Sequence, residues 1–161
     1  MAVILIIVTQ SCGMYSFSGA SIPDAMKTVS IKYFENNAPL VVSSLGRDFT
    51  QGLEDRIRNQ SRLNVVRGDA DASFEGRITG YDVSATAVQG NTQSTTNRLT
   101  ITVNVKYKNN LKPELSFEQS FSQYKDFSIA TSTLQQQEQT LIQAIIPLLT
   151  EDIFNRAFAN W

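Results

Sequence analysis

Residues 98–107 read RLTITVNVKY and carry the clearest structural signal in the chain. Apolar side chains occupy every second position from Leu99 to Tyr107, and polar side chains fill the positions between them. This period of two matches a β-strand, whose successive side chains point to opposite faces of a sheet. One apolar face and one wet face are typical of an antiparallel strand. We therefore expect a half-buried strand here, inside an antiparallel sheet.

Further strand patterns flank this segment on both sides. Within residues 73–86 the alternation places Phe74 and Ile78 on one face, and Tyr81 and Val83 on the opposite face. The segments in which we expect the other strands are 27–35, 63–66 and 115–124.

Two segments change to the period of a helix. Residues 44–60 carry an apolar side chain at every fourth position, and residues 133–158 carry an apolar stripe at spacings of three, four and seven. Thr133 is placed to cap the second helix, and Pro147 should kink it because proline lacks the backbone donor. We expect an α+β fold with two helices packed on one face of a four-stranded, mostly antiparallel sheet.

Composition excludes several classes of function. The chain has 161 residues, which suits one domain, and a formal net charge of −1, which does not suit a nucleic-acid-binding protein. It contains no histidine, so the commonest general base and the commonest metal ligand are both missing. The single cysteine cannot form a disulfide within the chain. We expect neither an enzyme nor a bound cofactor.

The single cysteine follows an apolar run near the start of the sequence. Residues 2–8 are all apolar, which is too short for a membrane span but suits the core of a signal peptide. Cys12 after such a run resembles a bacterial lipobox, in which the cysteine becomes the first mature residue and carries the lipid. The alternative is a small buried residue in a first strand, which would need no polar neighbours, whereas Ser11, Gly13 and Ser16 surround Cys12.

These features predict the organisation of the chain. We expect residues 1–11 to be a signal peptide, truncated because no Lys or Arg precedes its apolar run. Residues 12–24 should form a lipidated tether, and residues 25–161 a single domain. No acidic residue lies between Gly13 and Pro23, whereas some lipoproteins exported to the cell surface carry an acidic run there. We therefore expect an anchor on the periplasmic side of the outer membrane.

Few residues suggest chemistry. Asp69 and Asp71 form a turn and are more typical of solvated turn residues than of metal ligands. Gly76 and Gly80 lie within a strand pattern, so they should make room for a helix and not form a phosphate loop. The polar segment 89–96 has no apolar residue, which is typical of a hairpin loop or a mobile tip, and we expect it to lie at a partner contact.

Basic residues recur at the polar positions of the predicted strands. Arg77, Arg98, Lys106 and Lys108 fall on the wet face or its rim, together with Lys32. One interpretation is a solvated face with ordinary solubility charges. The other is an anion-binding surface, since Arg and Lys pair readily with phosphates. Spacing alone favours the solvated face.

Several segments resemble a known family. KTVSIKYFENNAPLV, NRLTITVNVKYKN, SFEQSFSQYKDF and the terminal EDIFNRAFANW are similar to the lipopolysaccharide-assembly lipoproteins, the LptE family, in a divergent branch. The resemblance runs from about Cys12 to Trp161. It implies two helices on a four-stranded sheet, which agrees with the periodicity, and it implies that Cys12 is the lipidated residue.

The resemblance also implies partners and a function. Members of the family sit as a plug inside the β-barrel protein LptD, bind lipopolysaccharide and help to insert it into the outer leaflet. We assign lipopolysaccharide contact to Arg77, Arg98, Lys106 and Lys108 from their strand positions alone. The alternative is a free-standing periplasmic lipoprotein that carries or senses an amphiphile without a barrel.

Overall fold

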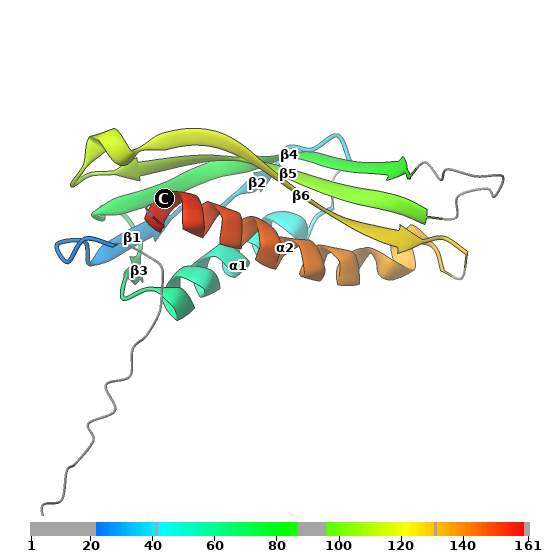
Figure 1. The fold of residues 1–161 in the computed structure, drawn as a ribbon, viewed down its shortest axis with the longest axis horizontal. Helices are drawn as coiled ribbons and strands as arrows, with labels where there is room; N and C mark the ends of the chain where they lie inside the picture. The colour runs from blue at the N-terminus through cyan, green and yellow to red at the C-terminus, as the bar shows by residue number, and fades with distance from the viewer. Residues whose placement is uncertain (1–21, 41, 87–95, 131, 160–161) are drawn as a thin grey trace, which may run out of the picture.

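The computed structural model describes residues 22–40, 42–86, 96–130 and 132–159. Helices and strands follow the predicted order, with two additional short elements (Figure 1). The elements are β1 (Thr28–Ile31), β2 (Glu35–Asn36), α1 (Leu45–Gln60), β3 (Asn64–Val66), β4 (Ala72–Ala85), β5 (Thr96–Asn109), the 3₁₀ turn η1 (Pro113–Leu115), β6 (Phe117–Ser128) and α2 (Leu134–Phe158).

The strands form one mixed sheet in the order β3-β1-β4-β5-β6, with β2 paired to β4 beside β1. The long strands β4, β5 and β6 are antiparallel, whereas β1 runs parallel to both β3 and β4, and β2 parallel to β4. The α+β class is confirmed, but the sheet has six strands, so the prediction of four is wrong. Two short strands account for the difference. β3 is the expected short segment 63–66, which joins the sheet beside β1, and β2 arises because the expected strand 27–35 breaks in two.

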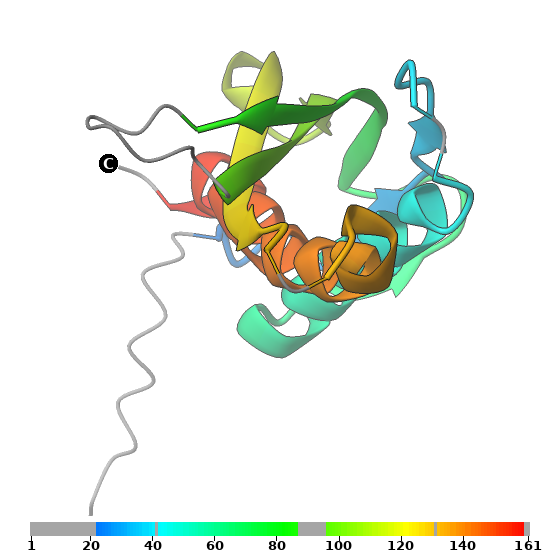
Figure 2. The same cartoon turned by 90° about the vertical axis from the view of Figure 1, so that its right-hand side faces the viewer.

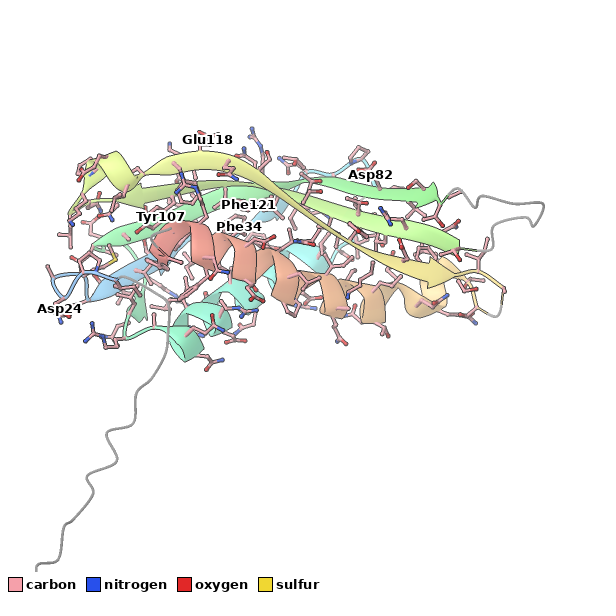
Figure 3. All side chains as sticks on the ribbon, in the orientation of Figure 1. Asp24, Phe34, Asp82, Tyr107, Glu118 and Phe121 are labelled. Atoms are coloured by element: carbon pink, nitrogen blue, oxygen red, sulfur yellow. The ribbon has the colours of Figure 1, made fainter. Side chains whose placement is uncertain are left out.

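Both helices cover the same face of the sheet (Figure 1), and the sheet curves over them in the orthogonal view (Figure 2). The alternation of residues 98–107 is confirmed, because Leu99, Ile101, Val103 and Val105 are fully buried beneath the sheet. Figure 3 shows Tyr107 and Phe121 between the sheet and the helices, and Glu118 on the opposite side.

Phe34 joins the two layers of the core at the β1–α1 connection. The expected strand 27–35 breaks there into β1 and β2, and the Phe34 side chain is fully buried. Its ring meets that of Phe49 on α1 edge to face, with 5.0 Å between centroids. Its backbone N–H donates to the hydroxyl of Thr50 at 3.1 Å, so α1 holds the break in place.

A β-bulge reverses the faces of β4 halfway along its length. The register shifts between Ile78 and Gly80, so that Thr79 is the additional residue opposite β5. Beyond it Tyr81 is buried, and the prediction that Tyr81 and Val83 lie on the outward face is wrong. The Tyr81 hydroxyl donates to Glu138 on α2 at 2.7 Å, and burial raises the pKa of Tyr81 well above its ordinary value.

The glycines of β4 make room for other groups than a helix. A Cβ at Gly76 would meet the backbone oxygen of Asn104 and the ring of Phe34, and one at Gly80 would meet Thr102. The prediction that these glycines accommodate a helix is therefore wrong. Close approach of the neighbouring strand and of the Phe34 ring is the reason for Gly76.

The second helix begins as predicted. Thr133 forms a capping box, in which its hydroxyl accepts from the N–H of Gln136 and the Gln136 side chain accepts from the N–H of Thr133. The helix continues unbroken through Pro147, and its kink there stays a prediction. The carbonyl of Pro147 accepts from Arg56 of α1 at 2.8 Å, which joins the two helices.

Gly52 of α1 lies directly against Ile146 of α2, and this contact predicts that substitutions at the two positions are coupled. A Cβ at Gly52 would lie 2.5 Å from Cγ2 of Ile146, so Gly52→Ala is expected to cost about 1–3 kcal/mol by overpacking. In an Ile146→Ala background the same change should instead stabilise by about 1 kcal/mol, because alanine is the better helix former. Urea unfolding of the four proteins measures the coupling, and equal effects in both backgrounds would contradict the contact.

Candidate functional site

The outward face of β4, β5 and β6 is the candidate site, because it is the face that the helices leave uncovered (Figures 1 and 3). Alternation along the strands aims polar side chains outward, among them Asp82 of β4 and Glu118 of β6 (Figure 3). The outward side chains of β5 from position 98 onward are Arg98, Thr100, Thr102, Asn104, Lys106 and Lys108.

The four predicted cations all belong to this face, but the structure brings only two of them together. Arg77 and Lys106 line one hollow of about 370 Å³, where Lys32 joins them from the end of β1. Arg98 and Lys108 lie outside this hollow, Arg98 near the start of β5 and Lys108 near its end.

Carboxylates balance the charge of this hollow. Glu75 accepts from Lys32 at 2.7 Å and contacts the ammonium of Lys106 at 3.2 Å. The hydrogen bond from Lys32, and then that from Lys106, hold the pKa of Glu75 below its ordinary value. Glu35 and Glu118 also line the hollow, so its three cations face three carboxylates and it presents no net charge.

Arg98 also forms an ion pair. Its guanidinium forms two hydrogen bonds to the carboxylate of Asp126, at 2.7 and 3.0 Å, in the bidentate arrangement that suits this pair. The same group lies 3.7 Å from the centroid of the Tyr124 ring. These hydrogen bonds hold the pKa of Asp126 below its ordinary value. Within the described segments, Arg77 and Lys108 are the two predicted cations without an ion pair.

The alternation of residues along each strand could not predict these ion pairs. Glu75 lies opposite Lys106, and Arg98 lies opposite Asp126, only because of the register of β5 with its two neighbours. The alternation places a residue on a face, but the pairing across strands needs the register.

Asp71 has a structural role at the start of the sheet. One of its carboxylate oxygens accepts from the backbone N–H groups of Lys27 and Thr28 and from the hydroxyl of Thr28, at 2.8 to 3.0 Å. The carboxylate thereby ties the start of β4 to the start of β1. Across the described residues, no group of three or more His, Cys, Asp or Glu side chains is placed to hold a metal ion.

Replacing Asp71 with asparagine should lower stability in a pH-dependent way. The hydrogen bonds from Lys27 and Thr28 hold the pKa of the Asp71 carboxyl below its ordinary value of 3.8. The ionised carboxyl therefore stabilises the fold fully above the unfolded-state pKa, and this contribution is lost as the pH falls through the lower folded-state pKa. Urea unfolding at about pH 7, 5 and 3 should show a difference between the two proteins that shrinks only below about pH 4. A difference that stays the same at all three values would contradict this role.

Two further predictions concern segments that lie wholly or mostly outside the described residues. Cys12 and residues 89–95 lie outside the described residues, and Thr96, the last residue of the predicted loop, is the first residue of β5. Among the described helices, none is both long and apolar enough to cross a membrane.

Solved structures with this arrangement of helices and sheet include bacterial lipoproteins. A minor lipoprotein from Acinetobacter baumannii superposes with a TM-score of 0.52 at 14% identity, covering 81% of this chain and 91% of its own. The hypothetical protein CT253 from Chlamydia trachomatis superposes with a TM-score of 0.56 at 9% identity, covering 84% and 100%. At these identities the likeness shows the fold alone. No curated protein matches the sequence.

Two helices on one face of a mixed sheet, with the other face polar and uncovered, define an α+β domain of the same fold class as these solved structures. Residues 26–157 match the sequence profile described as LptE, lipopolysaccharide-assembly, and the chain therefore belongs to the LptE family. The resemblance seen in the sequence is confirmed. The family is a non-catalytic family of assembly lipoproteins, and membership implies a role in lipopolysaccharide assembly.

Proposed function

We propose that this protein is the lipid-anchored plug of an LptD-type barrel in the outer membrane, with Cys12 as its anchor on the periplasmic side. Family membership over residues 26–157 is the observation that carries the proposal. The uncovered sheet face also supports it, since the inside of a large outer-membrane barrel is polar and water-filled. The ion pairs Lys106–Glu75 and Arg98–Asp126 can lie against such a wall without leaving either partner of the pair unbalanced.

Lipopolysaccharide contact belongs to the same proposal. Of the four cations assigned to it, Arg77 and Lys108 keep their charge free of an ion pair in the described part of the chain, so they are the two that we expect to meet phosphates. Arg98 would first have to give up its ion pair with Asp126, and Lys106 its ion pair with Glu75, before either could bind a phosphate.

The test is a mild-detergent pull-down of the tagged full-length protein from membranes, with quantitative mass spectrometry. We expect a large outer-membrane barrel at a one-to-one ratio, and loss of barrel assembly when the lipoprotein is depleted. The Cys12→Ser variant should reduce the yield of the complex in the outer-membrane fraction. A lone protein that carries lipid, together with normal barrel assembly after depletion, would replace the proposal with a free-standing amphiphile carrier.

A further inference from the structure

A second hollow lies where the segment before β1 meets the C-terminal end of α2. Its volume is about 440 Å³. Three separate parts of the chain form its wall: the lead-in around Met26, the β5–β6 connection, and the last turn of α2. Figure 1 shows the start of β1 and the end of α2 together at this end of the molecule.

The charge of this pocket differs from that of the outward sheet face. Lys112 and Arg156 line it, and none of the described carboxylates does. Neither cation forms an ion pair within the described residues. The Arg156 guanidinium lies 4.5 Å from the centroid of the Phe117 ring, which leaves its charge without an anionic partner. Two cations also outweigh the partial negative charge at the end of α2.

Apolar side chains form about half of the surface of this pocket. Met26 and Phe158 form the inner wall, while Leu115 stands at the rim with 39% of its surface exposed. A pocket that combines such a wall with two cations suits a ligand that has both an anionic group and a hydrocarbon part.

The turn that carries Lys112 is rigidly held. The buried side chain of Asn109 accepts from the backbone N–H groups of Leu111 and Lys112, at 3.0 and 2.8 Å. The N–H of Asn109 in turn donates to the hydroxyl of Ser116 at 2.9 Å. Because hydrogen bonds within the chain already hold this turn, binding would cost little additional conformational entropy.

Tyr107 supplies a neutral donor beside these cations. Its hydroxyl accepts from the Asn109 amide at 3.4 Å, and no described residue accepts the hydroxyl proton in return. Burial raises the pKa of Tyr107 to about 12, so this proton is kept at neutral pH.

We propose that this pocket binds the phosphate headgroup and upper acyl segment of an anionic phospholipid in the leaflet that holds the lipid anchor. Lys112 and Arg156 would hold the phosphate, and Met26, Leu115 and Phe158 would contact the hydrocarbon. The inference rests on the proposed anchoring at Cys12. Cys12 and Ile22 are ten positions apart, a length of chain that spans at most about 35 Å, so the tether keeps the pocket close to the membrane surface. Headgroup binding would fix which end of the domain faces the membrane.

The experiment uses the full-length lipoprotein in a neutral detergent. Dihexanoylphosphatidylglycerol, dihexanoylphosphatidylcholine and inorganic phosphate are titrated in turn while amide chemical shifts are recorded by NMR. We expect saturable shifts with the anionic lipid at residues 109–116 and 156–159, and no saturation with the zwitterionic lipid. Equal binding of both lipids would overturn the proposal, and so would inorganic phosphate that binds as tightly as the anionic lipid.

Matched charge changes locate the site. Lys112→Glu is expected to weaken binding of the anionic lipid roughly tenfold or more, through loss of one charge-assisted contact and gain of repulsion. Arg67→Glu is the control, because Arg67 is also exposed, carries no ion pair in the described segments and lies outside the pocket. Arg156→Gln should act like Lys112→Glu, with circular dichroism to verify its fold. Unchanged binding in Lys112→Glu would overturn the inference.

This assay contains no barrel protein, so its outcome is separate from that of the pull-down. Recovery of a one-to-one barrel complex without lipid binding would contradict the proposed lipid site and support the proposed function. Selective lipid binding by a protein that recovers no barrel would keep the pocket and reject the plug.

Discussion

Replacing Phe34 with alanine is expected to lower the free energy of unfolding by about 3–5 kcal/mol, a large part of the 5–15 kcal/mol typical of a whole domain. The side chain is fully buried, and its ring packs on Phe49 of α1 and over Gly76 of β4. Its removal would leave a cavity between the helix layer and the sheet, which the surrounding backbone can close only in part.

Urea unfolding followed by circular dichroism measures this loss. Leu40→Ala is the matched control, because Leu40 is a large apolar residue of the same β1–α1 connection with 57% of its surface exposed. It should change stability by no more than about 0.5 kcal/mol. A Phe34→Ala protein that unfolds at the same urea concentration as the control would contradict the placement of the ring.

Replacing Gly76 with alanine should cost about 3 kcal/mol, the upper end of the range for overpacking. The new Cβ would meet the backbone oxygen of Asn104 on β5, which is fixed by its place in the sheet, as well as the Phe34 ring. A backbone atom in the middle of a sheet cannot rotate aside, so two strands would have to separate.

Gly80→Ala provides the comparison on the same strand. Its Cβ would lie 3.1 to 3.2 Å from side-chain atoms of Thr102 and Asp82, which can move by a few tenths of an ångström. We expect a cost of about 1 kcal/mol, near the low end of the overpacking range. Thermal and urea unfolding of both variants should separate them clearly, and equal costs would show that the sheet relaxes around Gly76.

The buried and the outward side chains of residues 98–107 show what can be predicted from periodicity and what cannot. A period of two decides which β5 residues face the core, and burial of Leu99 and Val103 follows from it directly. The same reasoning put Arg77, Arg98, Lys106 and Lys108 on the outward face, where the structure has them. It could not state that Glu75 neutralises Lys106, because the two residues are paired only by the register of β4 with β5.

The reversal at Thr79 shows where periodicity fails. A single bulged residue moved Tyr81 and Val83 from the predicted outward face to the core. Nothing in the local pattern marks it, because the bulge serves the twist and register of the sheet as a whole. The pocket with Lys112 and Arg156 was missed for a related reason: its two cations are 44 positions apart, and neither lies in a strand pattern.

By itself, the amino-acid sequence determined the class of fold, the order of the long elements, the cap at Thr133 and the family, because each depends on periodicity or on residues adjacent in the chain. Tertiary structure alone decided the six strands, the reversal at Thr79 and the partners of each charge. These features depend on which distant segments meet. Short strands, bulges and ion pairs are selected by the packing of the whole sheet against its helices and have no periodic signature of their own.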